Sequence, residues 1–484
     1  MKVNDRSELG AKMRTATKWS AVTQLLAKLV SPITTMALAR LLTPDAFGIV
    51  ATLTMVISFA EIFTDAGFQK YVVQHQFKDE RDQDESINVA FWSNLIMSLF
   101  LWGIIALFSS PLAKLVGNPG YGYVLIIACV SIPIAAFSTI QSALYNRKLD
   151  YKTLFKVRIV SAMVPLFITV PLAFLLRNFW ALVVGTIVQN VVSAVLLTYH
   201  SAWKPRLFYS VEKLREMLSF SIWSMVEQVS IWLTNYVDVF IVGTALSQYY
   251  LGLYRTGSSI VGQITGLITA ITTPILFSSL SRLQDEKNEF LELFFKFQKI
   301  VGLLIIPLGV GIFIFRDFIT TIILGSQWGE AAYFIGLWGL TSSITIILSH
   351  YSSEVYRAKG KPKLSVLAQL LHIIVLWPTV LLAVKYGFET LCTARAIVRL
   401  ELIVVNLFIM YYLVKMPVAK LFTNVLPSLI ASCAMFVVIL LPKATALWQN
   451  VLYAVLASAI FCGVIMIFPK ERNILLNLKT YLRK

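Results

Sequence analysis

The sequence is poor in charged residues and in cysteine. Only 14% of its 484 residues are charged, whereas a soluble domain carries about 25%, so a soluble globular protein is excluded. Its four cysteines are Cys129, Cys392, Cys433 and Cys462. All four lie inside apolar runs, without the spacing of a zinc site or a disulfide framework. No Walker motif is present, and Gly309-Val310-Gly311 completes no nucleotide-binding glycine motif. The sequence therefore predicts no metal, no cofactor and no nucleotide-driven motor.

What the sequence has in abundance is apolar length. Hydrophobic residues make up 57% of the chain, and apolar runs of about 20 residues, long enough to cross a bilayer core, recur along it. We therefore predict an all-α polytopic membrane protein with about fourteen transmembrane helices. The predicted spans are residues 19–40, 47–69, 88–109, 122–145, 157–176, 179–200, 217–243, 250–279, 293–315, 331–356, 364–384, 389–413, 421–441 and 447–468.

The basic residues indicate an orientation. Most of the 42 Lys and Arg residues fall on the side that holds both termini and the even-numbered connections. By the positive-inside rule, we predict a multi-pass inner-membrane protein with both termini in the cytoplasm. The polar segment Met1–Lys18 lacks the pattern of a cleaved signal. Because the cations are scattered over many short loops, we expect membrane lipids as their partners and no nucleic acid.

An internal repeat divides the chain. Trp19–Gln24 resembles Trp223–Gln228, and Leu42–Ile49 aligns with Leu246–Leu253, at the constant offset that separates Gly48 from Gly252. The offset covers an even number of spans, so the repeats are parallel, as in transporters with two rocking lobes. We predict an N-lobe of six helices at residues 1–208, a C-lobe of six at 209–416, and two extra spans with a basic tail at 417–484.

A few charges lie inside the predicted spans, where an unpartnered charge is costly. The cations are Lys28, Arg255, Arg395 and Arg399, and the acids are Glu61, Asp65, Glu227, Asp238 and Glu401. Arg395 and Arg399 are four residues apart, so they share a helix face, which is favourable where water or an anion lies opposite. The guanidinium fork suits phosphate. Two interpretations stay open: the cations bind an anionic substrate, or they pair with the acids to hold helices together.

Two histidines also lie in predicted spans. His350 and His372 are each isolated in the sequence, and such a histidine is more often a hydrogen-bonded helix contact than part of a proton relay. The structural interpretation is therefore preferred for both.

Several turn residues carry a resemblance to a known family. The stretch Ala37–Gly48, with Arg40, Pro44 and Phe47, is followed by Thr64–Phe68 with Gly67, and Arg147 follows the fourth span. Together with Asp238–Gly243 and Leu251–Tyr254, which contains Gly252, these residues resemble the polysaccharide transporter family, the Wzx-type exporters of O-antigen, colanic acid and teichuronic acid units. That family belongs to the multidrug/oligosaccharidyl-lipid/polysaccharide flippase superfamily. The resemblance covers residues 15–415 in layout.

The resemblance implies two lobes around a cationic cavity that takes a polyprenyl-diphosphate-linked oligosaccharide from the inner to the outer leaflet for surface polysaccharide synthesis, alongside polymerase machinery. Lys28, Arg255, Arg395 and Arg399 would then hold the diphosphate. The alternatives are a multidrug or cation antiporter on the same scaffold, coupled through the acids, a scaffold for synthesis enzymes, and a membrane polymerase or ligase. The outer connections are short and carry no catalytic cluster, which argues against an enzyme.

Overall fold

The computed structural model describes residues 30–65, 67–361, 363–442 and 446–476. Within this part of the chain, the side chains of residues 219–224, 226 and 227 are also left out of the description. The regular elements of the described residues are all helices. The prediction of an all-α polytopic membrane protein is therefore confirmed, since eleven of these helices are long and apolar enough to cross a membrane.

The fourteen predicted spans are matched in part. The predicted span 19–40 lies largely outside the described residues, although residues 30–41 are helical. The predicted spans 217–243 and 389–413 fall on long helices that are not among the eleven, because polar or charged side chains such as Asp238 and Arg399 interrupt them. The count of fourteen stays a prediction.

The chain divides into two compact units, and the boundary between them along the sequence lies between Arg255 and Thr256. The predicted lobe boundaries at 208 and 416 follow the repeat and not this grouping, and they stay predictions. The first unit contains these helices: α2 (Pro44–Asp65), α3 (Phe68–Gln74), α4 (Glu80–Leu107), α5 (Ser109–Leu115), α6 (Gly122–Cys129), α7 (Ser131–Arg147), α8 (Tyr151–Val164), the π-helical segment η1 (Pro165–Thr169), α9 (Val170–Leu176), α10 (Trp180–His200), α11 (Val211–Ala245) and the start of α12 (Gln248–Arg282).

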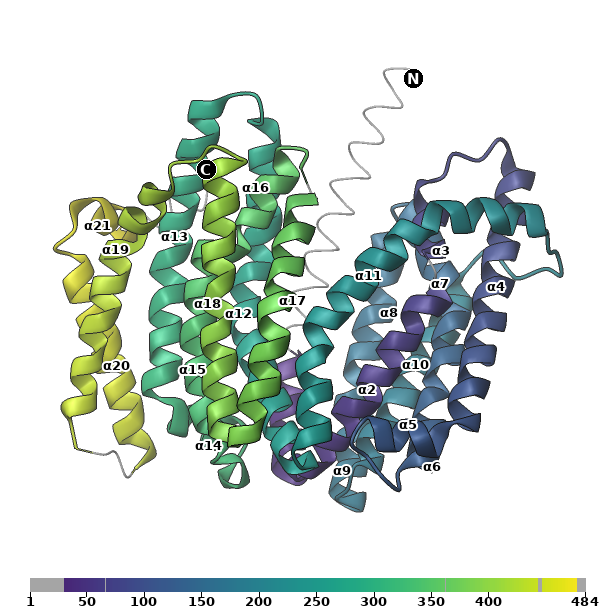
Figure 1. Ribbon diagram of the computed structural model, residues 1–484, viewed down its shortest axis with the longest axis horizontal. Helices are drawn as coiled ribbons and strands as arrows, with labels where there is room; N and C mark the ends of the chain where they lie inside the picture. Colours follow the sequence, from purple (N-terminus) through teal and green to yellow (C-terminus); the bar gives the residue numbers. More distant parts are fainter. Residues whose placement is uncertain (1–29, 66, 362, 443–445, 477–484) are drawn as a thin grey trace. The chain divides into compact units, whose positions relative to one another are not determined.

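In the first unit, the helices pack through several small apolar cores. One core joins α3, α4 and α7 around Phe68, Phe91 and Ile140. Another joins α2, α4 and α6 around Leu53 and Leu125. The helix α11 is long and packs against α2 (Figure 1). The helices α2 and α11 are neighbours in this unit.

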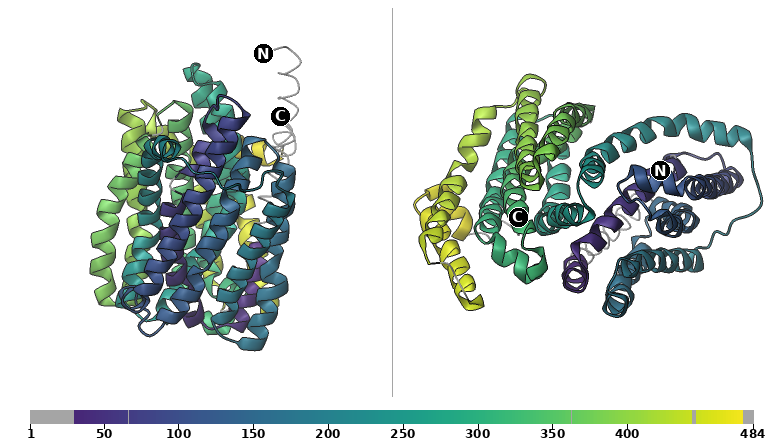
Figure 2. Two further views of the ribbon diagram at one scale, coloured as in Figure 1. Left: turned by 90° about the vertical axis from the view of Figure 1, so that its right-hand side faces the viewer. Right: turned by 60° about the horizontal axis from the view of Figure 1, so that its bottom comes forward.

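The second unit continues α12 and holds the rest of the chain. Its further elements are α13 (Lys287–Ile314), α14 (Arg316–Ile323), η2 (Ser326–Trp328), α15 (Ala331–Thr345), the π-helical segment η3 (Ile346–His350), α16 (Ser352–Ala358), α17 (Lys363–Ala383), η4 (Val384–Tyr386), α18 (Phe388–Tyr412), α19 (Val418–Ala434), η5 (Met435–Leu440), α20 (Leu447–Ile465) and α21 (Pro469–Leu476). The helices α13, α15, α17 and α18 run side by side along their length (Figure 1). The last two long helices, α19 and α20, pack on α13 at the edge of this unit (Figure 2).

Proline acts differently in different spans. Pro165 begins η1, where the α-helix of the predicted span 157–176 loosens into a π-helical segment. A proline lacks the N–H that the α-helical ladder needs, which explains a break at that point. Pro274, Pro307 and Pro378 instead lie inside continuous helices. A proline in these spans therefore does not by itself predict an interruption.

Candidate functional site: intramembrane arginines and their aromatic partners

The second unit contains a compact cationic cluster. Arg395 and Arg399 lie one turn apart on α18, and both guanidinium groups stack over the indole of Trp338 on α15. The distances from the guanidinium carbon to the ring centre are 4.9 Å for Arg395 and 4.4 Å for Arg399. The electron-rich face of an indole attracts a cation, most strongly where water is excluded. The two arginines share one helix face, as their spacing predicts.

A hydroxyl group completes the setting of this cluster. Nη1 of Arg399 donates to Oγ of Ser342, one turn along α15 from Trp338, at 2.6 Å. Arg395 is only 7% exposed, whereas Arg399 is half-buried. Trp338 and Ser342 are thus among the contacts of two like charges on neighbouring turns. Each guanidinium presents several donors in a fixed plane, which is the chemistry that phosphate binding uses in proteins.

Glu401, two residues after Arg399 on α18, pairs with a histidine. Its Oε2 lies 2.8 Å from Nδ1 of His372 on α17, and His372 is 2% exposed. His350 lies in η3, with Nε2 at 3.4 Å from Oγ1 of Thr273. Both histidines make helix-to-helix contacts, which is the interpretation that the sequence favours for them.

The first unit holds a second arginine site. The guanidinium carbon of Arg255, on α12, lies 5.1 Å from the ring centre of Tyr236 on α11. Tyr236 in turn stacks on Trp232, with ring centres 5.4 Å apart and planes inclined by 27°. Arg255 thus lies over an aromatic ring, as Arg395 and Arg399 do in the other unit.

The acids predicted for ion coupling or structure have different settings. Asp238 is 5% exposed and accepts a hydrogen bond from the Tyr254 hydroxyl at 2.5 Å, which ties α11 to α12. Asp65 accepts from the backbone N–H of Gln69 at 3.3 Å, next to the start of α3. Glu61 is half-buried on α2. Asp238 and Asp65 therefore have evident structural partners within the first unit.

Two predicted site residues cannot be placed. Lys28 lies outside the described residues, and the side chain of Glu227 is likewise not described. Their predicted roles stay predictions.

The motif residues of the family resemblance are mostly structural. Nη1 of Arg147, at the end of α7, donates to the carbonyl oxygens of Val72 at 2.9 Å and His75 at 2.7 Å, and its guanidinium covers the Phe77 ring at 4.6 Å. Arg147 thus satisfies carbonyl groups at the end of α3 and just after it, which lack partners within the helix. Gly67 precedes α3 with a φ of 77°, a left-handed conformation that favours glycine.

The two glycines related by the repeat lie at one helix crossing. A Cβ atom on Gly48 of α2 would stand 1.9 Å from the carbonyl oxygen of Gln248, and one on Gly252 of α12 would stand 1.9 Å from that of Pro44. Pro44 and Gln248 are themselves equivalent positions of the repeat. Nε2 of Gln248 also donates to the carbonyl oxygen of Gly117 at 2.6 Å. The crossing is close because both contact positions lack a side chain.

The remaining motif residues flank this crossing. Phe47 packs on the small core of Leu42, Ala46 and Ala173. Arg40, just before it, is exposed.

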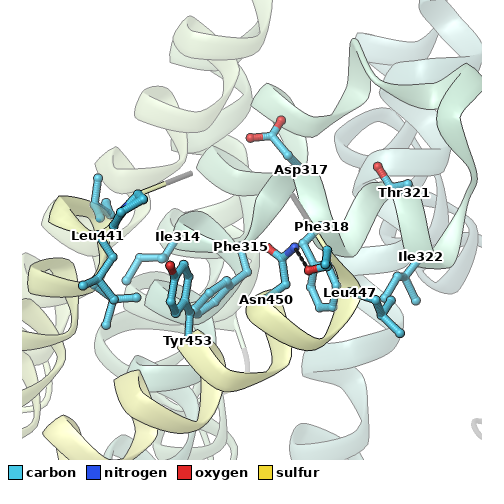
Figure 3. Close-up of a pocket in the computed structure, with 14 residues that line it drawn as sticks. Ile314, Phe315, Asp317, Phe318, Thr321, Ile322, Leu441, Leu447, Asn450 and Tyr453 are labelled. Carbon is cyan, nitrogen blue, oxygen red and sulfur yellow. Dashed lines mark hydrogen bonds between the residues drawn. The ribbon is translucent and has the colours of Figure 1, made fainter. Parts of the chain in front are cut away.

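Two adjoining pockets lie within the second unit. The first has a volume of about 430 Å³, between the end of α13, α14, η5 and the start of α20 (Figure 3). Asp317, Thr321, Asn450 and Tyr453 supply polar atoms at its wall. The second, of about 460 Å³, lies along α13 and α20 and is lined almost wholly by apolar side chains. The two share Phe315 and Phe318 in their linings. Among the residues that the structure describes, no group of three or more His, Cys, Asp or Glu side chains is placed to hold a metal ion.

Trp338 is the residue that sequence reasoning missed. Nothing in the sequence links it to the arginines, because they lie on different helices and the register between α15 and α18 is not encoded by spacing. A weak signal exists in the run Thr341–Ser343, one turn further on, which places three hydroxyl groups in an apolar span. Hydroxyl groups in such spans often contact neighbouring helices.

Comparisons with known proteins identify the family of this chain. The family described as polysaccharide biosynthesis protein matches residues 37–333, and the chain belongs to that family. The chain is 24% identical over 312 residues to the succinoglycan biosynthesis transport protein ExoT of Rhizobium meliloti, which covers 64% of this chain and 62% of that protein. It is 19% identical over 424 residues to the teichuronic acid biosynthesis protein TuaB of Bacillus subtilis, with 87% of each chain covered. The family resemblance seen in the sequence is thus confirmed.

Solved structures show the same fold. The lipid II flippase MurJ in an inward closed conformation superposes with a TM-score of 0.77 at 15% identity, over 94% of this chain and 99% of that chain. An inward-facing multidrug resistance transporter of the MATE family superposes with a TM-score of 0.62 at 14% identity, over 83% of this chain and 99% of that chain. At these identities the likeness establishes the fold and no more. The protein is a multi-pass membrane protein with this transporter fold.

Proposed function

We propose that this protein is a flippase that moves polyprenyl-diphosphate-linked oligosaccharide units from the inner to the outer leaflet of the bacterial inner membrane, with both termini in the cytoplasm. The observation that carries the proposal is the pair Arg395 and Arg399, stacked on Trp338 inside a member of the polysaccharide biosynthesis family. The relatives named as transport and biosynthesis proteins of surface glycans support the substrate class.

The chemistry of the arginine pair suits a diphosphate. A diphosphate carries its charges on two adjacent groups, and two guanidinium groups one turn apart can each donate to one of them. An intramembrane cation attracts an anionic substrate and repels a cationic drug. The arginine pair therefore favours the flippase over the cation antiporter, the alternative on the same scaffold.

The apolar part of the substrate needs a separate surface. A polyprenyl chain gains free energy wherever its CH₂ groups leave water, and it can stay in lipid or in an apolar pocket. The pocket along α13 and α20 has apolar walls and a volume of about 460 Å³, which suits a segment of such a chain. The proposed activity is transport, with no covalent chemistry. A polymerase that uses the exported unit would then be a partner of this protein.

The experiment measures the amount and the sidedness of lipid-linked oligosaccharide in membranes from cells with and without the protein. We expect the oligosaccharide to accumulate on the cytoplasmic leaflet, and surface polymer to be lost, when the protein is absent. Complementation with Arg399→Gln or Arg395→Gln should restore little of the export. A charged hydrogen bond contributes about 1.5 to 3 kcal/mol, which corresponds to a loss of about tenfold or more in substrate affinity.

Arg215→Gln is the matched control, because Arg215 is exposed on α11 outside the predicted span, and it should restore export fully. Unchanged lipid-linked pools and sidedness in cells without the protein would contradict the flippase. Altered accumulation of cationic drugs would then support the antiporter.

A further inference from the structure

An aromatic ladder runs across two helices of the first unit. Phe63 and Phe59 lie one turn apart on α2, with ring centres 5.1 Å apart, and Phe59 lies 4.7 Å from Trp232 of α11. Trp232 then stacks on Tyr236 at 5.4 Å, one turn along α11. These four rings, here called the aromatic ladder, form a continuous series that ends under the guanidinium of Arg255.

Trp232, one of the two inner rings of the aromatic ladder, is held in a fixed orientation. Nε1 of Trp232 donates to Oγ of Ser58, the residue before Phe59, at 3.0 Å. This hydrogen bond fixes the Trp232 indole relative to α2. The stacking of Tyr236 on Trp232 then fixes the orientation of the Tyr236 ring as well. An oriented ring binds a ligand with little loss of side-chain entropy, which makes it a good platform.

The surroundings of the aromatic ladder are polar. Asn235 is exposed, and Gln228 is half-buried, and both lie within one turn of Trp232 on the same face of α11. Phe59 is 39% exposed. An amide group facing lipid is unfavourable, because lipid offers it no hydrogen-bond partner. A face that combines accessible rings with amide groups therefore suits a ligand that has both apolar and hydroxyl-bearing surfaces.

We propose that the aromatic ladder is the platform for the sugar rings of the transported oligosaccharide. A pyranose presents C–H groups on its faces, which pack on an aromatic ring, and hydroxyl groups at its edge, which hydrogen-bond to amide groups such as that of Asn235. Arg255, at the end of the ladder, would meet an acidic group of the bound sugar. This inference rests on the proposed function and assigns sugar binding to α2 and α11 of the first unit.

The test compares two ligands on the purified full-length protein in lipid nanodiscs. One is the lipid-linked oligosaccharide extracted from cells that lack the protein, and the other is polyprenyl diphosphate without sugar. Trp232→Leu and Tyr236→Leu remove a ring and keep an apolar side chain. Each should bind the oligosaccharide-bearing lipid about 3- to 10-fold more weakly, the contribution typical of one aromatic contact, and should bind the sugar-free lipid as the wild type does.

Three further variants serve as controls. Trp232→Phe and Tyr236→Phe keep a ring and should retain most of the affinity for the oligosaccharide-bearing lipid. Phe167→Leu changes an aromatic residue of η1 that is 67% exposed and lies outside the ladder, and it should change neither affinity. Unchanged binding of the sugar-free lipid also shows that the leucine variants are folded.

The outcomes separate this inference from the flippase proposal. Leucine variants that bind the oligosaccharide-bearing lipid as tightly as the wild type would overturn the sugar platform and leave the flippase standing. Equal losses for both lipids would overturn it as well, because the rings would then contact the prenyl chain or support the fold. A wild-type protein that does not distinguish the two lipids would remove the sugar platform together with the proposed substrate.

Discussion

The helix crossing at Gly252 makes a sharp prediction for stability. In Gly252→Ala, the new Cβ atom would lie 1.9 Å from the carbonyl oxygen of Pro44, whereas real Cβ contacts are essentially never under 3.0 Å. The obstacle is backbone, so no side-chain rotation relieves it, and α2 and α12 must separate. Forced separation of a packed interface costs about 1 to 3 kcal/mol, and a backbone obstacle places this case at the upper end.

The matched control lies on the same helix. A Cβ atom on Gly262, also in α12, meets nothing within 4 Å. Gly262→Ala should therefore stabilise the protein by about 0.5 to 1 kcal/mol, because alanine loses less backbone entropy in a helix. We expect the free energies of unfolding of these two alanine variants to differ by about 3 kcal/mol.

The assay is the midpoint of thermal unfolding of the purified protein in one detergent, followed by tryptophan fluorescence, with Gly48→Ala as a third variant. Gly48 faces the carbonyl oxygen of Gln248 at the same 1.9 Å, so Gly48→Ala and Gly252→Ala should lower the midpoint by similar amounts, while Gly262→Ala raises it slightly. Equal midpoints for all three variants would refute the close crossing. A loss confined to one of the two crossing glycines would refute its reciprocity.

The ion pairs of two lysines give the remaining predictions. Nζ of Lys213, at the start of α11, lies 2.5 Å from Asp82 and 3.3 Å from Glu85. Burial lowers the pKa of Lys213, but these hydrogen bonds outweigh burial and leave the pKa above its ordinary value. Lys213→Met should therefore lower the free energy of unfolding by about 1 kcal/mol at neutral pH. The difference in stability between wild type and variant should vanish as the pH rises above about 10.4, because the lysine then loses its charge, and melting curves recorded over a range of pH measure it. Glu471, 5% exposed, lies 2.8 Å from Lys299. Glu471→Gln should lower the free energy of unfolding by about 3 kcal/mol in the same melting assay, because it leaves the Lys299 charge without its partner. The double variant Glu471→Gln/Lys299→Met should lose less stability. A double variant as unstable as the single one would contradict a paired charge.

The sequence predicted what depends on local pattern. Long apolar runs predicted the spanning helices, because lipid leaves a backbone no other way to satisfy its polar groups. The spacing of Arg395 and Arg399 predicted their common face, because helical geometry alone decides it.

What the sequence could not predict depends on register between helices. The stacking of both arginines on Trp338 depends on how α15 is positioned against α18. The contact of Asp238 with Tyr254 likewise depends on how α11 is positioned against α12. Asp238 illustrates the difficulty, since the sequence leaves ion coupling and a structural role both open and does not show that the Tyr254 hydroxyl contacts it. The motif glycines were visible in the sequence, but the close crossing that needs them was not.

The crossing of α2 and α12 also bears on how the chain arose. Position 44 of one repeat contacts position 48 of the other, and the equivalent Gln248 contacts Gly48 in return. Mutual contact between equivalent patches is the pattern of an isologous interface in a twofold-symmetric dimer. Two identical half-length chains that associated through this patch would form the same pair of contacts. Because each glycine meets a carbonyl oxygen, the partner side chains were free to diverge into proline and glutamine, whereas neither glycine could change.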